Sequence, residues 1–157
     1  MIYIWITTII AAVDVCIKNV IDKKEDKDFP KEMEGTGGSI MIYKNHNAGF
    51  PFGVGKQYPE LVKMIPLAVT SALIGIYAWL LPKKGQHIAK VGLALTLGGA
   101  FSNLYDRIVR GYVVDYFCIR FKALKKVALN LGDVFIFLGT SILLLNEFFQ
   151  SFKDKIR

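Results

Sequence analysis

Four long apolar blocks constrain the fold of this chain more than any other feature of its sequence. They lie at about residues 1–21, 61–81, 88–105 and 128–149. A helix needs about 20 mostly apolar residues to cross a bilayer core, and a chain in lipid must satisfy its backbone hydrogen bonds internally. We therefore expect an all-α membrane fold, a bundle of four transmembrane helices in a single domain over residues 1–157.

The first block is expected to stay in the protein as a membrane anchor. A cleaved signal peptide begins with a basic region and ends at a small-residue cleavage site. This block has neither feature, and it carries Asp14 and Lys18 toward its C-terminal end. It is therefore counted as the first transmembrane helix.

The net charge of +7 comes largely from Lys and Arg at the ends of apolar blocks. Anionic lipid headgroups attract basic residues at such positions. No aromatic–basic motif of the kind that binds DNA or RNA accompanies them, so membrane lipids and not nucleic acid are the expected partners. The cysteines, Cys16 and Cys118, and the histidines, His46 and His87, have no metal-ligand spacing, so we expect no metal and no cofactor.

Basic residues also predict the orientation of the chain in the membrane. The short loop 82–90 and the C-terminal tail are basic, whereas the first connection, at about 22–60, has six Lys and seven acidic residues. Short basic loops stay on the cytoplasmic side. We therefore expect both termini in the cytoplasm, and the connections at about 22–60 and 106–127 on the outer side.

The two outer connections predict small structures at the membrane surface. Residues 39–45, SIMIYKN, alternate in polarity like a short strand, and the turn-rich stretch NAGFPFG follows at 47–53. We expect a small extracytoplasmic β-element there. Residues 117–129, FCIRFKALKKVAL, have one apolar and one basic side, which predicts an interfacial helix.

Polar side chains at membrane depth are candidates for function. Asp14 and Lys18 are spaced i, i+4 with the acid first, which is the favoured order for an ion pair on one helix face. Asn103, Asp106 and Arg107 lie about one turn apart near the outer end of the third block. Each group also has a structural explanation, as an ion pair at a helix end and as an interhelical hydrogen-bond network.

Two further carboxylates, Asp115 in VVDYF and Asp133 in LNLGDVFIF, interrupt apolar runs without an adjacent cation. Burying an unpaired carboxylate costs several kcal/mol or forces it to take up a proton. A helix N-cap would explain Asp133, but it would not explain Asp115. Two close carboxylates share one proton, and the pair then supplies the base and the acid that water-mediated peptide hydrolysis needs.

Four segments together resemble the signal peptidase II family, the lipoprotein signal peptidases. They are VDVCIK at 13–18, NAGFPFG at 47–53, GGAFSNLYDRIVRGYVVDYF at 98–117 and LNLGDV at 129–134, in the order of the family. The resemblance implies a bacterial four-helix membrane aspartyl endopeptidase with a small extracytoplasmic β-cradle. Such an enzyme removes the signal peptide from diacylglyceryl-modified prolipoproteins and is blocked by globomycin. We expect it to act as a monomer in the cell membrane.

The resemblance also implies roles for individual residues. It makes Asp115 and Asp133 the catalytic pair. It gives positions that line or support the substrate site to Asn47, Gly49, Asn103, Arg107 and Asn130. It gives structural positions to Asp14, Lys18 and Asp106.

The chain departs from the family pattern at several positions around these residues. Phe50-Pro51 stands where the family commonly has two alanines, and Ser102 replaces a glycine. In the last segment the departures are Leu129 for Phe, Gly132 for Ala and Val134 for Ser. Both carboxylates are retained. Phe50-Pro51 adds bulk where the family is small, which predicts an altered substrate groove.

Three other functions fit parts of the sequence. A diverged family member could have a dedicated substrate, or could bind without turnover. A presenilin-type aspartyl protease shares the dipeptides YD and GD, but Asn130 stands where its G-x-G-D motif has the first glycine. A small proton-coupled transporter could use the same membrane acids and Lys18, although the sequence has no inverted repeat.

Overall fold

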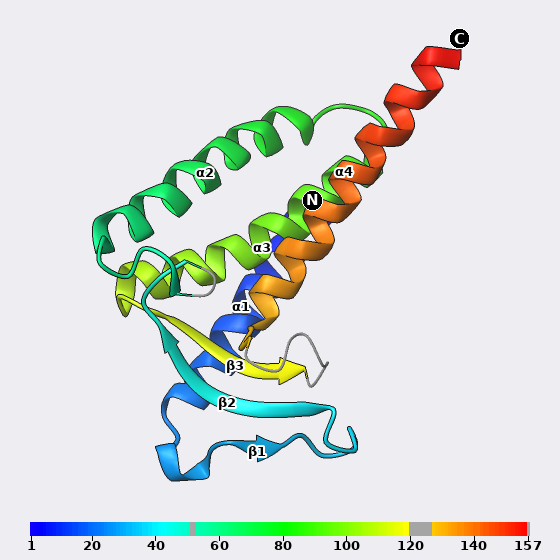
Figure 1. The fold of residues 1–157 in the computed structure, drawn as a ribbon. Helices are drawn as coiled ribbons and strands as arrows, with labels where there is room; N and C mark the ends of the chain where they lie inside the picture. Colours follow the sequence, from blue (N-terminus) through cyan, green and yellow to red (C-terminus); the bar gives the residue numbers. More distant parts are fainter. Residues whose placement is uncertain (51–52, 120–126, 157) are drawn as a thin grey trace.

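A computed structural model describes residues 1–50, 53–119 and 127–156, which form four long helices and a small sheet. In chain order the elements are α1 (Ile2–Asp22), β1 (Lys31–Glu32), β2 (Ile40–Asn47), α2 (Pro59–Leu80), α3 (His87–Val109), β3 (Val113–Ile119) and α4 (Leu131–Ile156), with a short 3-10 helix at Asp26–Asp28. The sheet lies at one end of the helices, and both chain termini point away from it (Figure 1). The described part of the chain is thus mostly helical, as expected.

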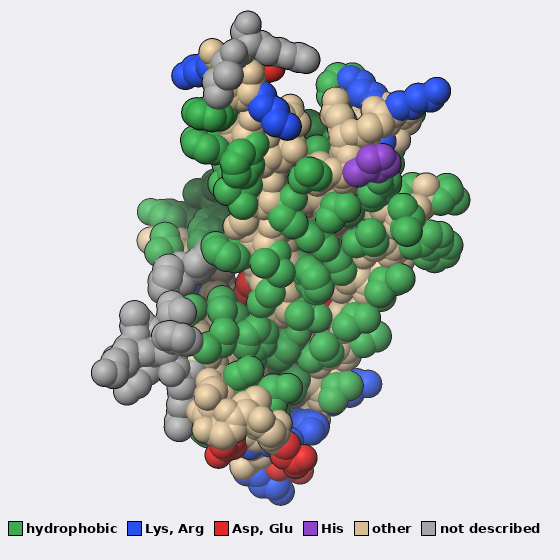
Figure 2. All heavy atoms as spheres, turned by 90° about the vertical axis from the view of Figure 1, so that its right-hand side faces the viewer, with side chains coloured by type: hydrophobic (Ala, Val, Ile, Leu, Met, Phe, Trp, Pro, Cys, Tyr) green, Lys and Arg blue, Asp and Glu red, His purple; other side chains and the backbone are tan. Residues whose placement is uncertain are grey.

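Within the described residues, α1, α2 and α4 are long and apolar enough to cross a membrane. Figure 2 shows hydrophobic side chains over the middle of the molecule, with charged side chains gathered at its two ends. The central helix α3 packs against α1, α2 and α4. It buries polar and small residues along most of its length, including Thr96, Ser102 and Asn103, which lowers its hydropathy without exposing polar groups to lipid.

Local sequence signals explain where the helices begin and end. α2 begins with Pro59, whose fixed φ suits the first helical position, and it stops two residues before Pro82. After α3, Gly111 takes a φ of 82°, which glycine adopts without strain. α4 begins at Leu131 rather than at residue 128, because Asn130 caps it: Asn130 Oδ1 accepts a hydrogen bond from the Asp133 backbone N–H at 2.9 Å.

The sheet has the order β1-β2-β3, and both pairs of strands are antiparallel. β2 covers most of the strand expected at 39–45 and runs on to Asn47. Asn45 stands opposite Asp115, next to an irregularity in the pairing between Ile42 and Asn45. This register places a row of amide side chains beside the first of the two carboxylates.

β3 corrects one expectation drawn from the sequence. Residues 117–119, expected at the start of an interfacial helix, are extended and belong to β3, while residues 120–126 of that stretch lie outside the described residues. β-branched and aromatic residues favour a strand, and VVDYFCI is rich in both. A core of Ile21, Val114 and Tyr116 packs this strand against the end of α1.

Glycines allow α3 and α4 to approach each other closely. A side chain at Gly99 would collide with the backbone carbonyl of Gly132, and one at Gly139 would place a Cβ only 2.5 Å from the carbonyl oxygen of Gly92. Small residues at helix contacts give this kind of close packing in membrane proteins. The contact fixes the start of α4, and therefore Asp133, against α3.

We predict that Gly99→Ala lowers the free energy of unfolding by about 1–3 kcal/mol, because overpacking forces the helices apart. Thermal unfolding of the purified protein in detergent measures this change. Gly75→Ala on α2 is the matched control, since a Cβ there meets nothing within 4 Å. Equal unfolding temperatures for the two variants would contradict the close contact of α3 and α4.

Candidate active site

The structure brings Asp115 and Asp133 together at the sheet end of the helices. Asp115 comes from β3 and is only 4% exposed, and Asp133 lies in the first turn of α4. Both carboxylates line one cavity of about 540 Å³. Two separate elements, β3 and α4, thus each supply one acid to the same site.

Asn130 connects the two acids. Its side-chain Nδ2 donates a hydrogen bond to Asp115 Oδ1 at 2.9 Å, and its backbone N–H donates to Asp133 Oδ2 at 3.1 Å. Its Oδ1 accepts from the Asp133 N–H, so Asn130 and Asp133 form a reciprocal cap at the start of α4. Asp133 therefore does help to cap a helix, as the structural reading of the sequence suggested. Capping leaves its other oxygen available for a second contact.

Other amide side chains surround the acids. Asn103 on α3 donates from Nδ2 to Asp133 Oδ1 at 2.8 Å. Asn45 on β2 approaches Asp115 Oδ2 at 3.5 Å, and Asn47 also interacts with Asp115. Each carboxylate is thus held by neutral donors and has no direct salt bridge within the described residues.

Burial changes the acidity of Asp115. Loss of contact with water raises the pKa of this carboxyl, and the nearby negative charge of Asp133 adds to the increase. Against the hydrogen bonds from Asn130 and Asn47, the pKa reaches about 6. A carboxyl group with this pKa changes its protonation state near neutral pH. It is therefore able to hold a proton that an ordinary surface aspartate would have lost.

The cavity shared by the two acids is largely apolar away from them. Its walls come from α2, α3 and α4 and include the following residues: Pro66, Val69, Thr70, Leu73, Thr96, Ala100, Leu104, Ile136, Phe137 and Thr140. A second cavity, of about 470 Å³, lies on the sheet side and is lined by polar residues such as Asn45, His46 and Lys56. Asp115 and Asn47 line both cavities. A bound polypeptide that extends past the two acids, from one cavity into the other, would therefore pass from an apolar to a polar environment.

Arg107 connects the apolar cavity to the loop after β2. Arg107 lines this cavity, and its guanidinium donates to the Gly49 carbonyl at 3.3 Å. The Gly49 N–H in turn donates to Asn47 Oδ1 at 3.0 Å. A side chain at Gly49 would come within 2.7 Å of the Val54 carbonyl oxygen, so this turn requires glycine. The loop after β2 is thereby tied to α3.

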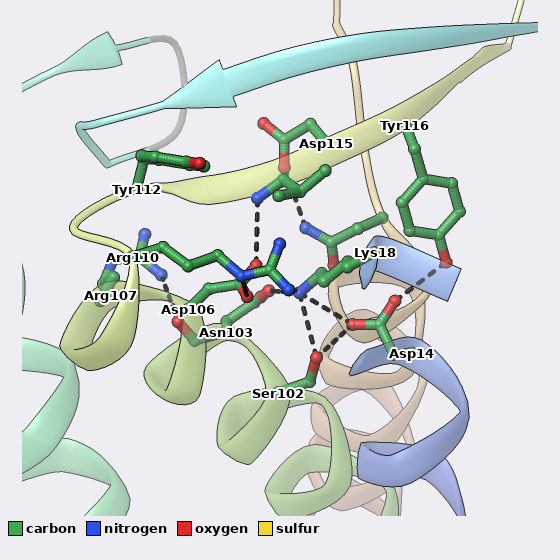
Figure 3. A network of polar contacts seen from close by, with 12 residues as sticks. Asp14, Lys18, Ser102, Asn103, Asp106, Arg107, Arg110, Tyr112, Asp115 and Tyr116 are labelled. Carbon is green, nitrogen blue, oxygen red and sulfur yellow. Dashed lines mark hydrogen bonds and ion pairs between the residues drawn. The ribbon is translucent and has the colours of Figure 1, made fainter. Parts of the chain in front are cut away.

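The polar residues of α1 are placed differently from the expectation of an ion pair at a helix end. Lys18 Nζ lies 2.9 Å from Asp14 Oδ2, but both side chains are fully buried and also contact α3 (Figure 3). Lys18 approaches Asp106 Oδ2 at 3.4 Å. The Ser102 hydroxyl donates to Asp14 at 2.6 Å and accepts from Lys18 at 3.0 Å. The pair is therefore the centre of an interhelical network.

Asp106 links this network to the sheet. Its Oδ2 accepts a hydrogen bond from the Val114 backbone N–H at 3.0 Å, and its Oδ1 lies 3.2 Å from Arg110 Nε. Val114 directly precedes Asp115 in β3. The carboxylate of Asp106 thus fixes the backbone beside the candidate catalytic residue, in agreement with a structural position.

Sequence reasoning missed Tyr116. Its hydroxyl donates to Asp14 Oδ1 at 2.9 Å and accepts from the Leu131 backbone N–H at 3.0 Å, so it joins α1, β3 and the start of α4 (Figure 3). Burial raises the pKa of Tyr116, which keeps the hydroxyl protonated. The only signal in the sequence was the tyrosine hydroxyl itself, a polar atom at the end of an otherwise apolar side chain. Many tyrosines in proteins have such a hydroxyl without connecting separate elements.

Comparisons with known proteins relate the chain to one family. The family model described as Signal peptidase (SPase) II matches residues 6–149. The lipoprotein signal peptidases of Brucella ovis and Brucella canis are each 32% identical to this chain over 119 residues, which cover 74% of this chain and 72% of theirs. A solved bacterial membrane enzyme, 19% identical, superposes with a TM-score of 0.78 over 95% of this chain and 88% of its own. The last similarity concerns the fold alone.

The raised pKa of Asp115 predicts a pH-dependent gain of stability in Asp115→Asn. The folded state holds the proton up to about pH 6, whereas the unfolded chain loses it near 3.8, so the charged carboxyl opposes folding above pH 6 and not below pH 4. At pH 8 we expect the variant to unfold at a higher temperature than the parent, with a free energy of unfolding that is larger by at most about 3 kcal/mol. At low pH the two proteins should unfold at the same temperature. Asp28→Asn, at an exposed position, is the control and should change neither value.

Proposed function

This chain belongs to the signal peptidase II family, and we propose that it removes the signal peptides of lipoprotein precursors with Asp115 and Asp133 as its catalytic acids. It is a membrane protease of the lipoprotein signal peptidase type. The observation that carries the assignment of the acids is the bridge through Asn130, which holds both carboxylates at the wall of one cavity. No other pair of acids among the described residues lines either of these two cavities.

The two carboxyl groups divide the work of peptide hydrolysis. The ionised one takes a proton from a water molecule as its oxygen attacks the carbonyl carbon of the scissile bond, and the protonated one donates its proton to the carbonyl oxygen. The tetrahedral intermediate then collapses, and one of its hydroxyl groups returns a proton to the carboxylate that had acted as the acid. The C–N bond breaks, and the departing amine receives the proton that was taken from water. The amides of Asn103 and Asn130 hold the carboxylates in place during these transfers.

The two cavities suggest how a precursor binds. The apolar cavity between α2, α3 and α4 fits the apolar signal sequence and the diacylglyceryl chains, because it is lined by hydrophobic residues and lies beside membrane-crossing helices. The polar cavity fits the residues that follow the modified cysteine. Arg107, which lines the apolar cavity, offers donors for a substrate carbonyl or glyceryl ester.

The departure at Phe50-Pro51 bears on the range of precursors. The Phe50 N–H donates to the Val54 carbonyl at 2.8 Å, and the Gly53 N–H donates to the Phe50 carbonyl at 2.9 Å, so Phe50 belongs to a tight turn. Phe50 is not among the described residues that line the two cavities, and Pro51 lies outside the described residues. We propose that the ordinary precursors of the family fit this groove.

The membrane arrangement of the family extends to this chain as a proposal. We place α3 as a fourth spanning helix, because it is 23 residues long and is surrounded by the three membrane-capable helices. The basic residues at the ends of α2 and α4 support an orientation with both termini in the bacterial cytoplasm, and the sheet and the two acids would then lie at the outer face of the cell membrane. The enzyme acts there as a monomer.

Replacement of either acid is predicted to abolish cleavage. Asp115→Asn and Asp133→Asn keep the shape of the side chain but remove an acid–base group, and each such group contributes about 10²–10⁴-fold. Because the two act as a unit, the double variant should be scarcely slower than either single one. Release of the signal peptide from a lipidated precursor measures the rate, and an unlipidated precursor is the substrate control.

The parent enzyme should have a bell-shaped dependence of rate on pH, whose two apparent pKa values belong to the pair. Asp28→Asn serves as the exposed carboxylate control and should cleave at the parental rate. Either active-site variant, if correctly folded and within a few-fold of the parental rate, would refute the aspartyl mechanism.

The proposed orientation predicts different labelling at the two ends of the molecule. A cysteine at Glu34, in the exposed connection before β2, should react with a membrane-impermeant thiol reagent in intact cells. A cysteine at Lys84, in the exposed α2–α3 loop, should react only after the membrane is opened. The parent chain, with Cys16 and Cys118, gives the background. The reverse pattern would place the acids on the cytoplasmic side.

A further inference from the structure

We infer that Lys18 is a positioning residue for the reaction, and that it acts through the amide of Asn103 to keep Asp133 as the ionised member of the catalytic pair. This inference depends on the proposed aspartyl mechanism. It goes beyond a structural ion pair, because it assigns the base and the acid to individual carboxyl groups. It also gives a function to the buried charges of α1, which do not touch the reacting atoms.

The first step of the argument is the set of contacts that Lys18 makes. Its ammonium is completely buried and has three N–H donors. It contacts Asp14 and Asp106, yet its shortest hydrogen bond, of 2.7 Å, goes to the neutral amide oxygen of Asn103. An ion pair with Asp14 would not require this contact. The positive charge is therefore aimed at α3, toward the candidate active site.

The second step is the orientation of Asn103. An ammonium group only donates hydrogen bonds, so the amide oxygen of Asn103 must face Lys18 and the NH₂ group must face away from it. That NH₂ group donates to Asp133 Oδ1 at 2.8 Å. Hydrogen bonds in a chain polarise one another. Lys18 thus strengthens the donor that Asn103 offers to the Asp133 carboxylate.

The third step is the difference between the two acids. Both oxygens of Asp133 accept a bond from an N–H donor, one from Asn103 and one from the Asn130 backbone, and such donors favour a charged carboxylate. Asp115 has one close side-chain donor, Asn130, a longer contact of 3.5 Å with Asn45 and an interaction with Asn47, but no backbone N–H donor among the contacts of the described residues. The shared proton is therefore held on Asp115, which acts as the acid, while Asp133 acts as the base.

Electrostatic attraction alone does not distinguish the two acids, because Lys18 and the Arg107 guanidinium each interact with both carboxylates. Asp14 on α1 is neutralised by Lys18, and Asp106 on α3 lies near Lys18 and Arg110. The α2 residues that line the cavity carry no charge. Lys18 differs in its hydrogen bonds: within the described residues, its route through Asn103 leads to Asp133 and not to Asp115.

The test uses a variant in which the buried pair is replaced and not broken, because one unpaired buried charge would destabilise the fold. Asp14→Asn combined with Lys18→Met removes both charges, and Asp14→Asn alone is the matched control, in which Lys18 keeps its charge and its contact with Asp106. For each protein, kcat/KM with a lipidated precursor is measured across pH. We expect the ascending limb of the profile to lie about one pH unit higher in the double variant than in the control, because the base is harder to ionise. Ser102→Gly, which removes one Lys18 contact and leaves the Asn103 contact, should keep the limb in place.

Asn103→Leu provides a second, independent test, because it interrupts the route while Lys18 keeps both of its acidic neighbours. We expect the same upward shift of the ascending limb, and no further shift when the Asp14 and Lys18 replacements are added. Thermal unfolding confirms that the proteins compared are folded. An unmoved limb in either folded variant would overturn the inference. If the limb does not move but Asp115→Asn and Asp133→Asn are inactive in the same assay, the proposed function stands and only the role of Lys18 is refuted.

Discussion

The buried ammonium of Lys18 is the constraint on which the rest of this structure depends. A charge at this depth is tolerated only when it is paired and fully hydrogen-bonded, and removing one partner of such a group typically costs about 3–5 kcal/mol. Lys18 meets this requirement with groups from two helices, and its partner Asp14 extends the network to Tyr116 on β3 and to the start of α4. The elements that carry the two catalytic candidates are therefore assembled around one positive charge.

Close helix packing and hydrogen bonding work together at the start of α4. Gly99 allows the backbone of α3 to touch Gly132, one residue before Asp133, and Asn130 caps the helix at the same place. The backbone N–H of Asn130 donates a hydrogen bond to Asp133, and its side-chain amide donates one to Asp115. One asparagine thus ends a connection, starts a helix and sets the relation of the two acids. Among the described residues, neutral donors and not a direct cation therefore hold both acids at the wall of the apolar cavity.

Two departures from the family pattern are neighbours in space, although thirty residues separate them in the sequence. Ser102 brings a hydroxyl group to Asp14 Oδ2, where the family has glycine. A Cβ at Gly132, where the family has alanine, would lie 2.8 Å from the same oxygen. The added hydroxyl and the missing methyl group therefore both alter the surroundings of Asp14.

The sequence by itself determined the class of the molecule and the identity of its candidate acids. Apolar blocks of membrane length require helices, because lipid offers no hydrogen-bond partners, and Asp115 and Asp133 were conspicuous as lone acids in apolar runs. Only the tertiary structure decided that β3 is a strand, because its pairing with β2 is a long-range contact, and that Tyr116 joins three elements through its hydroxyl. It also decided the surroundings of Lys18: local spacing predicted the pair with Asp14, but the contacts with α3 depend on how separate helices pack, which no local pattern encodes.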